Sequence, residues 1–297
     1  MIKKISIIGG GEIGGAISYI ATHAGISYSI WDKNPTKSST SSSEECLRDA
    51  GVVFFCLPSS ALRASLAELS LVLPPAIPLV FVSKGLEKDT GFTTPEIAAE
   101  FVEQERIVFM GGPMIAEEIV VGKGGCAVLG GTTETTSYII EIFENGGIHI
   151  ETEQDAFSVA ILGVLKNIYA MAIGAAEGAG KGDNIKAFLF AKSVYEMDIA
   201  SRALGGKVNV MSSAGIGDFL ATSISGGSSN RRAGFDFASG VLPVKISEGM
   251  SSVATLITRL KTNMPSDKLA LLPVTLFVRD IVINKSINAE DWNKILK

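Results

Sequence analysis

The stretch Ile5-Ser6-Ile7-Ile8-Gly9-Gly10-Gly11-Glu12-Ile13-Gly14 joins a short apolar run to the glycine pattern G-x-G-x-x-G. A strand that passes through these glycines into a helix is typical of dinucleotide-binding folds. Gly9 permits the tight turn, Gly11 lets the backbone approach a pyrophosphate, and Gly14 lets the helix pack on the sheet. The N–H groups of that helix then face the anion. A glycine-rich turn that binds no ligand is the alternative.

A second apolar strand, from Tyr28 to Trp31, ends at Asp32, about 20 residues beyond the glycines, where a ribose-binding carboxylate belongs. Asp32 favours the 2′-hydroxyl of NAD and would repel a 2′-phosphate. Lys33 and Lys37 would instead accommodate that phosphate. We therefore expect NAD as the cofactor, with NADP as the alternative.

Composition limits the classes of function. The chain has 297 residues, enough for two domains, with 46% hydrophobic and 19% charged residues. Charge and glycine interrupt the apolar stretches, and a strand follows Lys3 and Lys4, so we expect neither a membrane span nor a signal peptide. A net charge of −5 without a basic stripe argues against nucleic acid as a partner.

The three cysteines, Cys46, Cys56 and Cys126, are scattered and lack C-x-x-C spacing. This favours reduced core thiols in a cytoplasmic protein over a disulfide framework. His23 and His149 belong to no motif, and we interpret both as structural. We therefore expect no metal site.

The first half of the chain predicts an α/β fold, a doubly wound and mainly parallel sheet of the Rossmann type. Further strands are expected at 52–57, 79–82, 107–110, 126–129 and 148–150, and helices at 62–71, 96–103 and 135–143. The serine-rich run from Ser38 to Ser43 is interpreted as a mobile loop rather than a binding site.

From about Asp155 the pattern becomes helical, with helices expected at 157–177, 185–204, 253–261 and 268–283. We therefore expect a dinucleotide-binding Rossmann domain over 1–153 and an all-α, substrate-binding C-terminal domain over 154–297.

Three loops that should lie at the carboxyl ends of strands carry groups suited to chemistry: Leu57-Pro58-Ser59, Ser83-Lys84-Gly85 and Gly112-Pro113-Met114-Ile115-Ala116. Ligands bind at this edge in such sheets. Lys84 is a candidate functional residue here, and a solvated surface lysine is the alternative.

Lys166 lies inside the apolar segment Ile161-Leu162-Gly163-Val164-Leu165-Lys166-Asn167-Ile168. Burying an ammonium is costly and lowers its pKa, so a lysine here needs a carboxylate, a ligand or a catalytic task. A side chain that reaches the surface is the alternative. Asp218 is a candidate partner, although it also suits the start of a helix, and Thr222 lies one turn further on the same face.

Asn230, Arg231 and Arg232 form a polar, cationic group after a Gly-Gly-Ser-Ser turn. Two guanidinium groups suit a phosphate, and a solvated loop would have the same composition.

These residues, in order along the chain, resemble the NAD(P)-dependent glycerol-3-phosphate dehydrogenase family. The similarity includes Gly9-x-Gly11-x-x-Gly14, Lys84-Gly85, Gly112-Pro113 with Ala116, Leu165-Lys166-Asn167, Gly182-Asp183-Asn184, Gly217-Asp218 with Thr222, Asn230-Arg231 and Glu248-Gly249. β-Hydroxyacid dehydrogenases have an asparagine four residues after the lysine, where this chain has Ala170.

The resemblance implies hydride transfer between a nicotinamide cofactor and glycerol 3-phosphate or dihydroxyacetone phosphate, a helical substrate domain and commonly a homodimer. It makes Lys166 the general base, with Lys84 and Asn167 orienting the reacting oxygen and Asp218 and Thr222 holding the lysine. The expected cofactor-binding residues are Gly9, Gly11, Glu12, Ile13, Gly14, Asp32, Lys33, Lys84, Ala116 and Glu248. The expected substrate-binding residues are Lys84, Gly112, Met114, Lys166, Asp218, Ser228, Asn230 and Arg231.

The chain also departs from the family pattern. Ser229 replaces an arginine that contacts substrate phosphate and cofactor, Met114 replaces a small hydroxyl residue, and Ile13 replaces an aromatic. The segment after Trp31 is shorter than usual. Loss of one charged phosphate contact costs on the order of 1.5–3 kcal/mol. Two alternatives therefore stay open: a dehydrogenase acting on a different small alcohol or ketone, and a catalytically silent nucleotide-binding protein.

Overall fold

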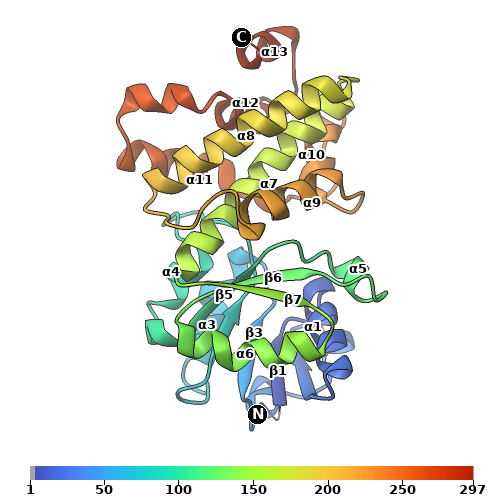
Figure 1. Ribbon diagram of the computed structural model, residues 1–297, viewed down its shortest axis with the longest axis vertical. Coiled ribbons are helices and arrows are strands. Elements are labelled where there is room, and N and C mark those ends of the chain that lie inside the picture. Colours follow the sequence, from blue (N-terminus) through green and yellow to red (C-terminus); the bar gives the residue numbers. More distant parts are fainter. Residues whose placement is uncertain (1–3, 297) are drawn as a thin grey trace. The chain divides into compact units, whose positions relative to one another are not determined.

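The computed structural model describes residues 4–296, which divide into two compact units (Figure 1). Unit 1 comprises the described residues up to Ser83 together with Phe92–Ala160. Unit 2 comprises Lys84–Gly91 and the residues from Ile161 onward. The predicted boundary after residue 153 lies at the end of a strand, whereas this division falls inside a helix.

Unit 1 is built on one seven-stranded sheet with the order β2-β1-β3-β4-β5-β6-β7. The strands are β1 (Lys4–Ile8), β2 (Ser27–Trp31), β3 (Val52–Phe55), β4 (Leu79–Phe81), β5 (Ile107–Gly111), β6 (Cys126–Gly130) and β7 (His149–Glu153). Neighbouring strands are parallel except β5 and β6, which pair antiparallel. The predicted α/β class and doubly wound Rossmann sheet are confirmed.

Short helices connect these strands. They are α1 (Glu12–His23), η1 (Pro35–Lys37), α2 (Ser43–Leu47), α3 (Ser59–Leu69), α4 (Thr94–Ala98), η2 (Gln104–Arg106), α5 (Ala116–Ile119) and α6 (Thr133–Asn145). Apolar side chains of α1 and α6, including Ile17, Ile20 and Phe143, pack on one face of the sheet against Ile7 and Phe54. The strands are buried on this face because helices cover it.

Unit 2 contains helices (Figure 1). They are α7 (Ala156–Gly178), which begins in unit 1, α8 (Asp183–Ala203), the wide turn η3 (Ser213–Gly217), α9 (Asp218–Ile224), α10 (Ser229–Ala238), α11 (Glu248–Asn263), η4 (Ser266–Leu271), α12 (Pro273–Asn284) and α13 (Ala289–Ile295). The all-α C-terminal domain is confirmed.

Helix α7 is the central helix of unit 2, and glycines allow α10 to approach it closely. A Cβ on Gly174 would lie 1.8 Å from the carbonyl oxygen of Arg231, and a Cβ on Gly234 would lie 1.9 Å from that of Met171. By length and composition α7 could span a membrane, which we had expected of no segment, but 89% of its most apolar window is buried. A helix buried on several faces is apolar all round, so its composition alone does not indicate a membrane span.

Several elements differ from the prediction. The helix expected over 268–283 is broken, because Pro273 has no N–H to continue η4 and instead begins α12. Helix α10 was missed, so Asn230 and Arg231 lie on a helix and not in a loop. The serine run precedes α2 as a loop, in agreement with its interpretation as one; Ser39 Oγ accepts from Ile30 N at 2.8 Å, and Ser42 caps α2.

Candidate functional site

The glycine loop of unit 1 has the geometry that its pattern predicts. Gly9 has a φ of +106°, and a Cβ there would lie 2.5 Å from the carbonyl oxygen of Cys56. A Cβ on Gly14 would lie 2.0 Å from the carbonyl oxygen of Gly9, so only glycine lets α1 begin this close to the strand. A Cβ on Gly11 would meet nothing within 4 Å. The N-terminus of α1 therefore has open space beside Gly11, which suits a pyrophosphate.

Asp32 holds this loop in place. Its Oδ2 accepts a hydrogen bond of 2.8 Å from Gly10 N, and its Oδ1 accepts one of 2.8 Å from Asn34 N. Lys33 and Lys37 are both exposed beyond it. The carboxylate lies at the end of β2, where a ribose-binding acid is expected, with two lysines in the following turn.

The loop after β5 turns at Gly112, which has a φ of +87°. Cys126 N donates to the carbonyl oxygen of Pro113 at 3.2 Å. Met114 is buried in the apolar core of unit 1, and Ala116 and Ile13 pack against the same core. The side chain of Met114 therefore fills the core, which explains why an apolar residue is tolerated at that position.

The strongest candidate for chemistry is a cluster of two lysines and a carboxylate in unit 2. Lys166 is 8% exposed; its Nζ lies 3.0 Å from Asp218 Oδ1 and donates to Thr222 Oγ1 at 2.6 Å. The Nζ of Lys84 lies 2.6 Å from Asp218 Oδ2. Lys166 thus does not reach the surface, and Asp218 does not cap α9, since its carboxylate is bound by two ammonium groups and Gly217 occupies the cap position.

The electrostatics of this cluster set the proton affinity of Lys166. Burial lowers the pKa of Lys166 to about 8; the Asp218 carboxylate raises it, and the Lys84 ammonium lowers it. Burial alone would raise the pKa of Asp218, but the ammonium groups of Lys166 and Lys84 hold it below its ordinary value. A buried lysine with a pKa near neutrality can exchange a proton at physiological pH.

A second set of hydrogen bonds fixes the backbone N and O atoms of Lys84. Glu248 Oε2 accepts from Lys84 N at 3.1 Å and from Asn167 Nδ2 at 3.4 Å, and Asn167 Nδ2 also donates to Lys84 O at 3.0 Å. Asn230 Oδ1 accepts from Gly249 N at 2.8 Å at the start of α11. The structure therefore brings together Lys84, Lys166, Asn167, Asp218, Thr222 and Glu248 within one unit.

The arginines lie elsewhere. Arg231 pairs with Glu177 and donates from Nε to Ser225 O at 3.2 Å, and Arg232 pairs with Asp236 at 2.7 Å. Glu177 lies about 16 Å further along α7 than Lys166, at about 1.5 Å per residue. Ser228 caps α10, with its Oγ accepting from Arg231 N at 3.2 Å. The expected phosphate clamp of Arg231 and Arg232 is therefore not assembled beside Lys166.

Sequence analysis missed two residues that support the cluster. Gly163 lies one helical turn before Lys166 and gives room to the Lys84 stem, since a Cβ there would lie 3.0 Å from Lys84 Cγ. Ser252 Oγ accepts from Leu86 N at 3.0 Å and so anchors the Lys84–Gly91 segment to α11. A glycine within an otherwise apolar helix was the available signal for Gly163.

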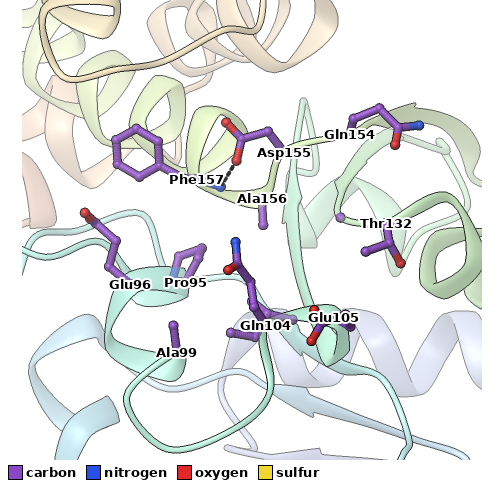
Figure 2. A pocket seen from close by; sticks show the side chains of 12 residues that line it. Pro95, Glu96, Ala99, Gln104, Glu105, Thr132, Gln154, Asp155, Ala156 and Phe157 are labelled. Atoms are coloured by element: carbon purple, nitrogen blue, oxygen red, sulfur yellow. Dashed lines mark hydrogen bonds between the residues drawn. The ribbon is translucent and has the colours of Figure 1, made fainter.

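Unit 1 also has a cavity of about 400 Å³ (Figure 2). Its lining includes Gln104, Gln154 and Asp155; the Gln104 side chain points into the space, and the Asp155 carboxylate accepts from Phe157 N at 3.1 Å. Ile107, the first residue of β5, also lines it, so the cavity lies at the amino end of that strand. The glycine loop follows the carboxyl end of a parallel strand, and the cavity is therefore separate from the candidate cofactor site.

Comparison with known proteins gives a consistent result. Residues 38–137 match the family model described as NAD-dependent glycerol-3-phosphate dehydrogenase N-terminus, and residues 155–290 match the C-terminus of the same family. The chain is 30% identical over 315 residues to glycerol-3-phosphate dehydrogenase [NAD(P)+] of Fusobacterium nucleatum, covering 96% of this chain and 91% of that protein. The corresponding protein of Moorella thermoacetica is 29% identical over 297 residues, covering 91% and 87%.

Solved structures agree in fold. Glycerol-3-phosphate dehydrogenase from Coxiella burnetii superposes with a TM-score of 0.85 at 20% identity, covering 99% of this chain and 98% of that chain. The Plasmodium falciparum enzyme gives a TM-score of 0.85 at 17% identity, covering 99% and 95%. A ketopantoate reductase of the PanE/ApbA family from Ralstonia eutropha gives 0.61 at 14% identity, covering 98% and 99%.

Proposed function

The chain belongs to the NAD-dependent glycerol-3-phosphate dehydrogenase family, and from that premise we propose that it catalyses reversible hydride transfer between glycerol 3-phosphate and NAD(P)+. The observation that carries the proposal is the buried cluster of Lys166, Asp218 and Lys84, which holds a lysine of lowered pKa beside a fixed carboxylate. The products of oxidation are dihydroxyacetone phosphate, the reduced cofactor and one proton.

The residues of unit 1 fit a dinucleotide. The open space beside Gly11, the free N-terminus of α1 and the Asp32 carboxylate at the end of β2 match the needs of a pyrophosphate and a ribose. When bound, the nicotinamide accepts or donates the hydride. Gly9, Gly11, Glu12, Ile13 and Gly14 would line the site of the dinucleotide at its pyrophosphate. Because Asp32 carries a negative charge, NAD is favoured, with Lys33 and Lys37 available to NADP.

Lys166 acts as the general base in oxidation. Its neutral amine accepts the proton of the substrate C2 hydroxyl while the C2–H bond breaks and its electron pair leaves as hydride, so the C–O single bond becomes a carbonyl. The lysine ends protonated, facing Asp218. In reduction the same ammonium donates a proton to the oxygen as hydride arrives at C2.

The neighbouring groups position that proton transfer. Asp218 fixes both ammonium groups, Thr222 accepts a hydrogen bond from Lys166, and Lys84 supplies a second positive charge to polarise the reacting oxygen. Asn167 and Glu248 hold the backbone of Lys84. Because Lys166 must be neutral to act as a base, oxidation should accelerate as pH rises through about 8.

The decisive experiment replaces Lys166 by alanine. Turnover of dihydroxyacetone phosphate, followed at the nicotinamide absorbance, should fall at least 10²-fold, the usual contribution of a general acid or base. NADH binding should stay unchanged. Lys186→Met is the matched control, because Lys186 forms a surface ion pair of 2.7 Å with Asp183. Substantial residual activity in the alanine variant would remove Lys166 as the base.

A second candidate is a dehydrogenase of the same build acting on a different small hydroxy or keto compound. The specific observation is that Arg231 pairs with Glu177, while Ser229 stands where the family pattern has arginine. A panel of ketones with and without a phosphate group separates the two. Fast turnover of dihydroxyacetone phosphate excludes the second candidate, and cofactor binding without turnover of any compound would indicate a silent protein.

We also propose a cytoplasmic homodimer. Three free cysteines, Cys46, Cys56 and Cys126, suit a reducing compartment. The segment between α10 and α11 exposes Val241, Leu242, Val244 and Ile246, with Val244 95% exposed. Clustered exposed apolar residues of this kind mark association surfaces. Light scattering of the Val244→Asp variant should then show a monomer, and a dimer in that variant would exclude this surface.

A further inference from the structure

Three side chains with metal-binding atoms meet on one face of the sheet in unit 1. The ligand atoms of Cys126, His149 and Glu151 all lie within 4.8 Å of one another. Cys126 begins β6 and His149 begins β7, and the parallel pairing of these strands places the two residues side by side. Glu151 follows His149 by two positions, so it points to the same face.

The opposite face of these strands is occupied by the apolar core. Ala127 and Ile148 belong to that core, and Ile150 packs against it. Because side chains alternate along a strand, the three ligand-bearing residues point away from the core. Cys126 and Glu151 are half-buried, and His149 is exposed on the edge strand. An ion from solvent can therefore reach the cluster, while backbone pairing fixes the spacing of its members.

The donor set is chemically specific. A thiolate, an imidazole and a carboxylate together suit a borderline-soft divalent cation of the Zn²⁺ type, and three protein ligands plus one water complete a tetrahedron. In such a site the ligand atoms lie about 3.4–3.6 Å apart, as metal–ligand distances of about 2.0–2.3 Å require. The separations of the ligand atoms, all within 4.8 Å, exceed that spacing by at most about 1.4 Å.

We propose that Cys126, His149 and Glu151 form a binding site for a Zn²⁺-type cation. The ion joins the edge strand β7 to β6 through side chains, in addition to the backbone ladder. It also connects to the loop after β5, because Cys126 N donates to Pro113 O at 3.2 Å and a Cβ on Gly112 would lie 2.7 Å from Cys126 O. Bound metal therefore restrains the Gly112-Pro113 turn.

The other two thiols are poor competitors for the ion. Burial raises the pKa of the Cys46 thiol, and it raises that of Cys56 to about 12. Metal binding requires the thiolate, which both environments disfavour. We expected no metal site from the sequence. The three ligands come from two strands that α6 separates, so no closely spaced motif in the chain indicates them.

Cobalt titration of the full chain tests the site directly. Co²⁺ substitutes for Zn²⁺ and gives a thiolate-to-metal charge-transfer absorption only when a cysteine sulfur is a ligand. We expect this absorption to saturate at one ion per chain and to be displaced by Zn²⁺. Saturation should also raise the midpoint of thermal unfolding, because the ion binds the folded state.

Single substitutions identify the ligands. Cys126→Ser should abolish the charge-transfer absorption, and His149→Gln and Glu151→Gln should each weaken Co²⁺ binding at least tenfold. His23→Gln and Cys56→Ser are the matched controls and should bind as the unsubstituted chain does. Binding without the absorption, an absorption that survives Cys126→Ser, or equal losses in the controls would overturn the proposal. Activity is not the readout, so failure here leaves the dehydrogenase proposal untouched.

Discussion

Replacing Asp218 by asparagine removes the carboxylate that pairs with both Lys84 and Lys166 while keeping the shape of the side chain. The carboxylate lies 3.0 Å from Lys166 Nζ and 2.6 Å from Lys84 Nζ. At an effective dielectric constant of about 20, a charge pair at that longer distance interacts by about 5.5 kcal/mol, equivalent to about 4 pKa units. Water that enters the variant site replaces much of the lost charge-pair energy. We therefore expect the pKa of Lys166 to fall by at least about one unit.

Two measurements follow from that change. In the unsubstituted chain, oxidation should rise with pH through an inflection at about 8, the pKa of Lys166. In Asp218→Asn the inflection should move to lower pH, and the maximal rate should fall because the lysine is no longer fixed. The pH dependence of kcat/KM, measured at saturating cofactor, reports the pKa of the lysine before substrate binds, and kcat reports the maximal rate.

Stability should change with pH as well. Breaking a buried ion pair from one side costs about 3–5 kcal/mol. When the pKa of a lysine is lower in the folded than in the unfolded state, the unfolded state binds more protons at pH values between the two. The free energy of unfolding therefore falls as pH falls through this range. In Asp218→Asn the folded pKa of Lys166 is lower, so this pH range extends below pH 8. The loss in free energy of unfolding relative to the unsubstituted chain, measured with urea, should therefore be larger at pH 6 than at pH 8.

Asp183→Asn is the control, because Asp183 pairs with Lys186 on the exposed surface and should leave both measurements unchanged. The reasoning is refuted if Asp218→Asn keeps an inflection at about pH 8 and unfolds at the same urea concentration as the unsubstituted chain.

Other substitutions test the supports of the two sites. Gly14→Ala places a Cβ 2.0 Å from Gly9 O and should destabilise unit 1 by about 1–3 kcal/mol and weaken NADH binding, measured by urea unfolding and fluorescence titration. Gly15→Ala, whose Cβ meets nothing within 4 Å, should instead be neutral or stabilising by up to about 1 kcal/mol; equal loss in both would contradict the steric argument. Gly163→Ala should lower kcat by displacing the Lys84 stem, whereas unchanged kcat would show that the stem adapts. Burial raises the pKa of Glu196 from 4.5 to about 7, so its contribution to stability is present below about pH 4.5 and is lost as pH rises to about 7. Glu196→Gln should remove that dependence in thermal unfolding, and an unchanged pH profile would show that Glu196 is not its source.

Local pattern was sufficient for the glycine loop and for Lys166. The need for glycine at Gly9, Gly11 and Gly14 comes from a positive φ, open space and a close contact, respectively, within one strand-turn-helix segment. An ammonium group in an apolar helix must have a partner or a function, which singled out Lys166. Sequence therefore predicted the sheet, the helical second half and the buried lysine, and it named Asp218 as the lysine's partner.

Features that depend on distant segments were not predictable. That β6 runs antiparallel to β5, and that β7 brings His149 beside Cys126, depends on sheet pairing and not on local propensity. The pairing of Arg231 with Glu177 depends on how α10 packs against α7, which side-chain periodicity does not specify. Helix α10 itself was missed because its polar first turn has the composition of a loop.

The Lys84–Gly91 segment has a consequence for how such a protein can be divided or recombined. It belongs to unit 2 although unit 1 flanks it on both sides, and it is anchored there by Ser252 and by Arg259, whose guanidinium donates to Gly91 O at 2.8 Å. A single cut cannot separate the two units, because any C-terminal fragment that begins at Ile161 has lost one of the two cations that neutralise Asp218. Exchanging unit 2 between relatives therefore requires three junctions, and the Lys84–Gly91 segment must be exchanged together with the residues from Ile161 onward.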